Sequence, residues 1–233
     1  MSPVYPATGS AQDQAAALRW DAVIHRWWIE PAATGRYPAG PLPADRLAAM
    51  LDIRPGDETE LAAGRDFVGV NYYTPTVVRH DPARNGPLEV EVDAKWGAPP
   101  PGAAADATAW GWAIHPRGLR DVLNRVHQVA GAPIEVLENG AAYPDGPGAD
   151  GRVRDVRRIA YLRAHLTEVA AAIGEGVPVG GYHCWSLLDN FEWQAGYSQR
   201  FGLVHVDYAN GRKRTIKDSG RWYAAVARAN ALT

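Results

Sequence analysis

Three times along this 233-residue chain, an apolar segment of strand length is followed by a loop and then by a helix. The predicted strands and helices alternate in the order 67–73, 116–129, 133–138, 153–173, 177–187 and 219–231. Repeated strand–helix units form a parallel sheet whose faces are covered by helices. An eight-stranded barrel of such units typically needs about 250 residues, but only three strands can be read here. The order therefore predicts either an incomplete barrel or a small open sheet.

The first part of the chain predicts helices and no further strand. Ser10 and Asp13 form a capping-box start, and an apolar stripe continues this helix to about residue 33. No convincing strand precedes it. Residues 35–43 are rich in turn-forming types and lead to a short helix over 44–51. The sequence thus offers no fourth strand–helix unit in this region.

Two other segments interrupt the regular order. Residues 74–109 form a long excursion that contains three consecutive prolines. A structureless loop of that length is usually functional or disordered. Near the C-terminus, residues 202–208 and 212–216 flank Asn210-Gly211, a pair that favours a tight β-hairpin.

The composition excludes several classes of partner. The formal net charge is -2 and no basic stripe is present, so neither nucleic acid nor an anionic membrane is an expected partner. No apolar run approaches the ~20 residues that cross a bilayer, and the N-terminus lacks the pattern of a signal peptide. The single cysteine, Cys184, fits a reducing compartment. We therefore expect a cytoplasmic protein with no metal and no cofactor.

Polar side chains stand where the predicted strands end. Asn71 and Tyr73 close the first strand, Glu138 closes the second, and Trp185 lies near the end of the third. A carboxylate at the tip of a buried strand is costly unless its charge is used. In parallel α/β folds, chemistry takes place at the carboxyl ends of the strands. We therefore expect these four side chains to lie close together.

The alternation of side chains along a strand gives a more detailed expectation. It places Ile134, Val136 and Glu138 on one face, with the aliphatic pair packed inside the barrel and Glu138 at its rim. Glu135 then faces the helix layer, and no function is assigned to it. His183 is expected to be an interior histidine with satisfied hydrogen bonds.

The side chains at the strand tips suit a carbohydrate site. Tyr73 can donate a phenolic hydrogen bond to the Glu138 carboxylate. Trp185 offers a flat face on which a pyranose ring can stack. Glu192 and Trp193, in the loop after the third strand, offer an acceptor and a donor to adjacent sugar hydroxyls. A carboxylate with such neighbours can act as a nucleophile at an anomeric carbon.

Each of these residues also has a purely structural interpretation. Glu138 alone fits a strand-end carboxylate capped by nearby backbone, and Trp185 and Trp193 fit core positions. Asp189 and Asp207 are expected to hold loops by hydrogen bonding rather than to act in catalysis. On residue types alone the structural interpretation leads, so the assignment depends on the motifs that surround these residues.

Longer motifs favour the carbohydrate interpretation. Residues 185–193, W-S-L-L-D-N-F-E-W, match in full a segment of glycoside hydrolase family 1, the β-glucosidase family. Residues 137–140, L-E-N-G, resemble the family's T-E-N-G nucleophile motif, and residues 69–74 resemble its G-x-N-Y-Y-T strand. Residues 111–119 and 196–208 extend the resemblance over essentially the whole chain.

The resemblance implies a fold and a set of roles. The fold is the C-terminal portion of a (β/α)8 TIM barrel, about strands 6–8 with their helices, as a single partial domain over residues 1–233 that lacks the N-terminal strands. The activity is β-glucosidase-type hydrolysis, with Glu138 as the nucleophile and Tyr73 orienting it. Trp112 faces the aglycone side. The implied substrate-binding residues are Asn71, Trp112, Trp185, Glu192, Trp193 and Phe201. Glu192 favours a neutral β-glycoside, because its carboxylate repels a phosphorylated sugar.

One motif of the family is absent. Its general acid/base is a glutamate within Asn-Glu-Pro, and this tripeptide does not occur here; Glu30-Pro31 lies inside the first predicted helix. Loss of general acid–base catalysis typically lowers a rate by ~10²–10⁴-fold, so we expect the chain alone to be inactive or very weak. A truncated gene product and one half of a split enzyme with a separate N-terminal half-barrel chain both fit.

Two other functions stay open. The first is a non-catalytic sugar-binding or vestigial barrel fragment. The second is an open α/β module of unrelated function, which requires the match over residues 185–193 to be a coincidence.

Overall fold

A computed structural model describes residues 1–38, 44–84, 86–93 and 98–232. Part of the predicted connector over 35–43 lies outside these residues. The strands are β1 (Val4–Pro6), β2 (Val68–Asn71), β3 (Thr76–His80), β4 (Val90–Val92), β5 (Ile134–Asn139), β6 (Val179–Cys184), β7 (Val204–Asp207) and β8 (Lys213–Ile216). The helices are α1 (Ala11–Asp21), α2 (Trp27–Thr34), α3 (Ala44–Leu51), α4 (Asp57–Leu61), α5 (Pro116–Ala130), α6 (Val156–Gly174) and α7 (Asp218–Ala229). A π-helical turn, Ala22–Arg26, joins α1 to α2.

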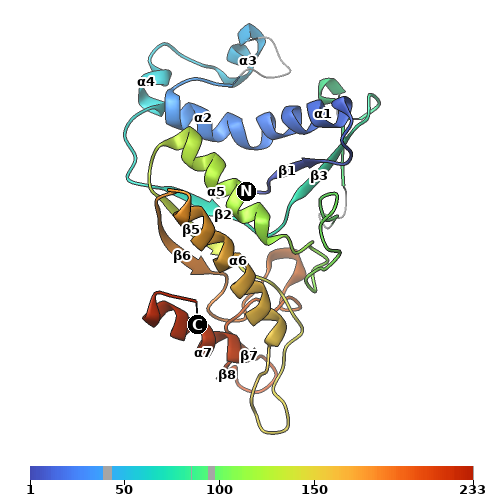
Figure 1. Cartoon of the computed structure of the whole chain (residues 1–233), viewed down its shortest axis with the longest axis vertical. Helices are drawn as coiled ribbons and strands as arrows, with labels where there is room; N and C mark the ends of the chain where they lie inside the picture. Colours follow the sequence, from blue (N-terminus) through green and yellow to red (C-terminus); the bar gives the residue numbers. More distant parts are fainter. Residues whose placement is uncertain (39–43, 85, 94–97, 233) are drawn as a thin grey trace.

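The centre of the molecule is a parallel sheet in the order β2–β5–β6. Helices α5 and α6 lie side by side against one of its faces (Figure 1). The core between them is aliphatic, with Val70, Leu123, Ile134 and Val136 fully buried. The three predicted strand–helix units are thus confirmed. The described strands form three separate sheets, of which β2–β5–β6 is open, and no closed barrel, as an incomplete barrel requires.

The N-terminal region differs from the prediction in one respect. Ser10 caps α1 as expected, since its hydroxyl accepts from the Asp13 amide at 3.1 Å. The Asp13 carboxylate then accepts from the His80 amide at 2.8 Å, which ties α1 to β3. A short strand, β1, does precede α1 and pairs in parallel with β3. The prediction that no strand precedes α1 was wrong, because a strand of three residues is too short to give a periodic signal.

The excursion after β2 also contains regular structure. Strand β3 pairs with β4 in antiparallel fashion, from Val78 opposite Val92 to His80 opposite Val90. Val78 and Val90 are buried against α1. The described part of residues 74–109 is therefore not the structureless loop that its prolines indicated. The predicted C-terminal hairpin is present as β7 and β8.

The pairing of β2 with β5 changes register at the end that carries the polar side chains. Val70 lies opposite Val136, but Asn71 lies opposite Glu138, so β5 has one extra residue there. A bulge of this kind re-aims the side chains beyond it. Ile134 and Val136 pack against the helices, whereas Glu138 turns to the opposite face of the sheet. The expectation of one shared face was wrong, because simple alternation takes no account of a bulge.

The same orientation corrects the expectations for two further residues. Since Ile134 and Val136 face the helices, Glu135 between them faces the other side of the sheet, not the helix layer. Its Oε2 lies 3.3 Å from Nε2 of His183 on the neighbouring strand. The His183 side chain is 61% exposed, so it is not an interior residue. Gly181 leaves room for the Glu135 carboxylate, which a Cβ at that position would meet at 2.0 Å.

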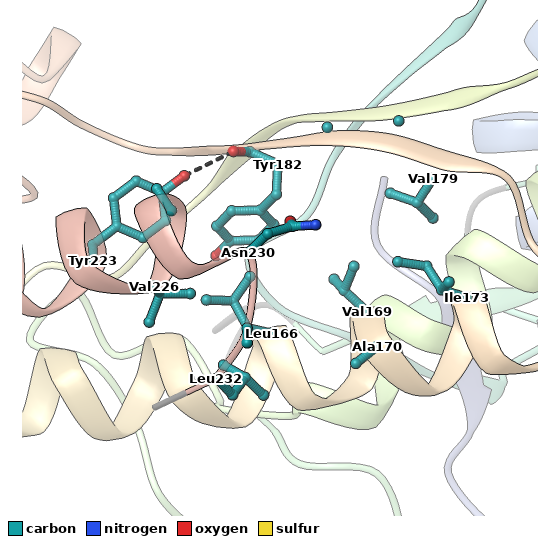
Figure 2. Close-up of a pocket in the computed structure, with 14 residues that line it drawn as sticks. Leu166, Val169, Ala170, Ile173, Val179, Tyr182, Tyr223, Val226, Asn230 and Leu232 are labelled. Atoms are coloured by element: carbon teal, nitrogen blue, oxygen red, sulfur yellow. Dashed lines mark hydrogen bonds between the residues drawn. The ribbon is translucent and has the colours of Figure 1, made fainter.

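An apolar groove of about 380 Å³ runs along β6, between α6 and α7 (Figure 2). Strand β6 is the last strand of the described sheet on this side. The Tyr223 hydroxyl of α7 donates to the Tyr182 carbonyl of β6 at 2.8 Å and closes one end of the groove (Figure 2). Aliphatic side chains such as Leu166, Ile173 and Leu232 line the rest. The groove therefore lies beside the edge at which a further strand would extend the sheet.

Among the described helices, none combines the length and apolar character required to cross a bilayer.

We expect the stability of this fold to fall in mild acid because of His165. The imidazole is fully buried in α6, stacks on Tyr161 with ring centroids 3.9 Å apart, and uses Nδ1 for the Tyr161 carbonyl at 2.8 Å. Burial lowers the pKa of His165 to about 4. Between pH 6.5 and 4 the unfolded chain binds a proton that the folded chain does not bind. The free energy of unfolding should thus decrease by up to roughly 3 kcal/mol as the pH falls through this window.

The variant His165→Phe keeps an aromatic ring on Tyr161 and removes the titrating group. Urea unfolding at several pH values should show a smaller decrease between pH 6.5 and 4 for this variant than for the parent chain. An identical pH dependence of the two proteins would contradict the assignment.

Candidate active site

Glu138 and Tyr73 come together at the carboxyl ends of β5 and β2. The Tyr73 hydroxyl donates to Oε2 of Glu138 at 2.7 Å. Both residues are half-buried. Burial, and then the hydrogen bond to Glu138, raise the pKa of Tyr73 far above its usual range. Tyr73 therefore remains a neutral donor at any physiological pH, and it fixes the orientation of the carboxylate.

Asn139 holds the strand tip from the helix side. Its amide nitrogen donates to the Tyr72 carbonyl at 2.8 Å and to the Tyr161 hydroxyl at 3.1 Å. Its amide oxygen accepts from the Tyr182 hydroxyl at 2.6 Å. With its side chain satisfied between α6 and the sheet, Asn139 keeps Glu138 turned to the other face. The strand predicted over residues 133–138 stops before Asn139, so nothing in the sequence indicated this role.

Trp185 and Glu192 lie on the β6 side of Glu138. The Trp185 amide donates to the Asn139 carbonyl at 2.9 Å, so the ends of β5 and β6 touch. Only glycine fits at residue 140, because a Cβ there would meet the Trp185 carbonyl oxygen at 1.8 Å. The indole nitrogen of Trp185 donates to Oε1 of Glu192 at 3.0 Å. Glu192 is buried, whereas Trp193 beside it is 84% exposed.

Aromatic rings extend from Tyr73 on the β2 side of Glu138. The Trp112 ring lies 5.4 Å from the Tyr73 ring, and the Phe201 ring lies 6.1 Å from each of them. Phe201 is buried and comes from the loop after β6, so it joins the two sides of the site. Trp110, which the sequence reasoning did not single out, stacks on Trp112 with ring centroids 4.8 Å apart.

Asp189 holds the loop that carries Trp185 and Glu192. Its carboxylate accepts from Arg200 at 2.8 Å, from the Gly202 amide at 2.9 Å and from Lys217 at 3.1 Å. Burial lowers the pKa of Lys217, and the two aspartates near it oppose this shift. The carboxylate thus fixes three segments of chain at once, as the structural interpretation of Asp189 predicts.

Arg158 extends this buried network to the loop after Glu138. Its guanidinium is 1% exposed and donates to Asp155 at 2.9 Å, to the Arg200 carbonyl at 3.0 Å and to the Phe201 carbonyl at 3.3 Å. It also binds Asp145 and the Ala141 carbonyl. Arg158 therefore joins α6, the loop after β5 and the loop after β6 in one set of charge-assisted hydrogen bonds.

The structure thus brings together most of the side chains that the sequence singled out. Glu138, Tyr73 and Asn71 meet at adjacent strand ends. Trp185 and Glu192 form a pair on one side, while Trp112 and Phe201 form a cluster on the other. Trp193 points into solvent. Among the described residues, no group of three or more His, Cys, Asp or Glu side chains is placed to hold a metal ion.

An oriented carboxylate, with a phenol and indoles around it at the strand ends of a parallel α/β sheet, is the arrangement of a glycosidase. The chain belongs to glycosyl hydrolase family 1, since the model of that family matches residues 1–232.

Individual relatives agree with this assignment. The chain is 37% identical over 231 residues to β-glucosidase A of Acetivibrio thermocellus. The aligned region covers 97% of this chain and 49% of the relative. It is 45% identical over 206 residues to β-glucosidase A of Thermotoga maritima, with 88% of this chain and 44% of the relative covered. A solved family 1 β-glucosidase of Thermotoga maritima superimposes with a TM-score of 0.84 at 36% identity, over 100% of this chain and 50% of that one.

The chain therefore spans about half the length of the relatives that it matches. Its fold is the corresponding half of a (β/α)8 barrel. The missing strands explain why the sheet is open. The same solved enzyme is also known in complexes with isofagomine lactam and with deoxynojirimycin, at TM-scores of 0.83 and 0.84.

Removal of the buried lysine should destabilise the network beneath the site. Lys217→Met preserves the apolar stem but leaves Asp189 and Asp145 with one cation fewer. We expect the free energy of unfolding in urea to fall by about 3–5 kcal/mol. Lys213→Met, which changes an exposed lysine of β8, is the matched control and should cost less than about 0.5 kcal/mol. Equal losses in the two variants would contradict the role of Lys217.

Proposed function

We propose that this chain forms the nucleophile side of a retaining β-glucosidase site. The observation that carries the proposal is the orientation of Glu138. The bulge in β5 turns its side chain to the face of the sheet away from α5 and α6, and the Tyr73 hydroxyl donates to its carboxylate at 2.7 Å. In this mechanism the Glu138 carboxylate attacks the anomeric carbon, the bond to the leaving oxygen breaks, and a glycosyl ester forms. Water then hydrolyses that ester and releases the sugar.

The other side chains have matching roles in binding the sugar. Trp185 provides a flat surface for the glycone, and its hydrogen bond presents Glu192 to the sugar hydroxyls. We assign Asn71, which lies opposite Glu138 on the neighbouring strand, to the hydroxyl next to the anomeric centre. We assign Trp193, the exposed neighbour of Glu192, to the sugar hydroxyls furthest from the bond that breaks. The Glu192 carboxylate favours a neutral β-glucoside or related β-glycoside over a phosphorylated sugar.

The acid/base carboxylate comes from outside these 233 residues. Retaining hydrolysis places two carboxyl groups about 5–5.5 Å apart, and the sequence contains no Asn-Glu-Pro. The relatives have about half of their length outside the region that matches this chain. We propose that a complementary half of the barrel supplies this group and packs along the free edge of β6. The apolar groove beside β6 supports that placement. The single Cys184 supports a reducing, cytoplasmic compartment.

A mechanism-based label tests the role of Glu138. A 2-deoxy-2-fluoro-β-glucoside with a dinitrophenolate leaving group needs no general acid, because the leaving group departs as a stable anion. We expect slow formation of a fluoroglucosyl ester, detected by mass spectrometry on the peptide that contains Glu138. Glu138→Gln should abolish the label.

Glu135→Gln is the matched control, since Glu135 is three residues away on the same strand and pairs with His183. This variant should be labelled like the parent chain. Labelling that persists in Glu138→Gln, or that moves to Glu135, would exclude Glu138 as the nucleophile.

The absence of Asn-Glu-Pro also favours a second candidate, a non-catalytic sugar-binding or vestigial barrel fragment. In that case Glu138→Gln leaves sugar binding unchanged and no labelled peptide forms in either protein. The fluoroglucoside experiment therefore separates the two functions.

A further inference from the structure

The face of the central sheet that is turned away from α5 and α6, the inner face, carries an ionisable pair near the amino ends of its strands. Its members are Gly69 of β2, Glu135 and Leu137 of β5, and Gly181 and His183 of β6. In a complete (β/α)8 barrel, bulky branched side chains usually fill this face. Two glycines, a carboxylate and an imidazole are therefore an unusual set, and they call for a partner of particular chemistry.

Glycines of the neighbouring strands make room for the two side chains of β5. A Cβ on Gly69 would meet Cδ1 of Leu137 at 2.3 Å. On the other side, a Cβ on Gly180 would meet Oε1 of Glu135 at 2.7 Å, and one on Gly181 would meet Oε2 at 2.0 Å. Glycine inside a strand weakens it and often marks a close approach of other atoms. The two consecutive glycines of β6 thus form a recess for the Glu135 carboxylate.

The pair of Glu135 and His183 lacks a cation. Oε2 of Glu135 lies 3.3 Å from Nε2 of His183, and Oε1 accepts no hydrogen bond from any residue that the structure describes. The Glu135 side chain is 28% exposed and the His183 side chain 61% exposed, so water can solvate both. A partner that covers the inner face removes this water. The covered carboxylate then needs a counter-charge, because an unpaired buried charge is strongly destabilising.

A second carboxylate–imidazole pair in this chain shows how such a pair is satisfied when it is covered. Oδ2 of Asp189 lies 3.4 Å from Nδ1 of His205, and their side chains are 1% and 8% exposed. Two cations complete this pair, since Arg200 donates to Asp189 at 2.8 Å and Lys217 donates to it at 3.1 Å. The pair on the inner face has the same two groups, and within the described part of the chain no lysine or arginine forms an ion pair with it.

The relatives indicate what covers the inner face. About half of their length lies outside the region that matches this chain. In a complete barrel, side chains from all the strands meet in one packed interior. The complementary half-barrel therefore places its inward-facing side chains against Glu135, Leu137 and His183.

We propose that Glu135, with His183 beside it, selects a complementary half-barrel that carries an inward-facing arginine. The planar guanidinium of an arginine can bind both oxygens of the carboxylate. Leu137 is 44% exposed and offers an apolar surface to the stem of such a side chain. A half-barrel with only apolar side chains at this level leaves the Glu135 carboxylate buried without a counter-charge and is rejected. This inference rests on the proposed function for the nature of the partner.

A display selection tests the proposal. The N-terminal half of the Thermotoga maritima β-glucosidase is displayed with its inward-facing strand positions randomised, and the intact chain is the bait. We expect arginine to be enriched about fivefold among clones that bind the parent chain, but not among clones that bind Glu135→Gln. Single arginine clones should bind Glu135→Gln about 30-fold more weakly than the parent in biolayer interferometry, because the guanidinium is then buried and unpaired.

The matched control is Glu89→Gln. Glu89 also lies near a histidine, with Oε2 3.9 Å from Nδ1 of His80, but this pair belongs to the region of β3 and β4 and not to the inner face. Glu89→Gln should bind the arginine clones as tightly as the parent does. Binding clones without arginine enrichment, or arginine clones that bind Glu135→Gln as tightly as the parent, would overturn the proposal and leave the proposed function intact.

Two other results would also overturn the proposal. If no clone binds either bait, the inner face does not accept a half-barrel, and the role of Glu138 is then judged by the fluoroglucoside label, which needs no partner. If sedimentation of the chain alone shows a dimer that Glu135→Gln disrupts, the inner face belongs to a second copy of this chain.

Discussion

A largely buried, charge-balanced network supports the loops on which the site depends. Three aspartates alternate with three cations between α6, the loops after β5 and β6, and the start of α7. The members are Asp145, Asp155, Asp189, Arg158, Arg200 and Lys217. Removing one partner from such a network leaves another charge buried and unpaired, which strongly destabilises the fold. The network therefore restricts the positions of the loops that carry Trp185, Glu192 and Phe201.

The network and the bulge in β5 act on different parts of the same site. The bulge decides which face of the sheet Glu138 occupies, while the network decides where the indole of Trp185 and the ring of Phe201 stand relative to it. Asn139 links the two, because its side chain is anchored to α6 and its carbonyl accepts from the Trp185 amide. Half of a barrel can in this way hold the geometry of the candidate site without the remaining strands.

The sequence was sufficient for the order of the three strand–helix units and for the residues at the strand tips, but not for the short strands β1, β3 and β4. Contiguous motifs such as residues 185–193 carry that information. It was insufficient for the orientation of Glu138 and Glu135, since one inserted residue reverses the alternation and leaves no local signal. Arg158 and Lys217 were also missed. Both types are usually exposed, and only the three-dimensional arrangement of distant aspartates reveals that they are buried.

We have proposed that this chain contributes the nucleophile side of a site whose acid/base lies in a complementary half-barrel. The most direct test mixes the chain with the non-matching N-terminal half of a relative, such as the β-glucosidase of Thermotoga maritima, and measures cleavage of an aryl β-glucoside. We expect a one-to-one complex whose activity appears only in the mixture and is lost with Glu138→Gln. A complex that forms without any cleavage, or cleavage that survives Glu138→Gln, would contradict it.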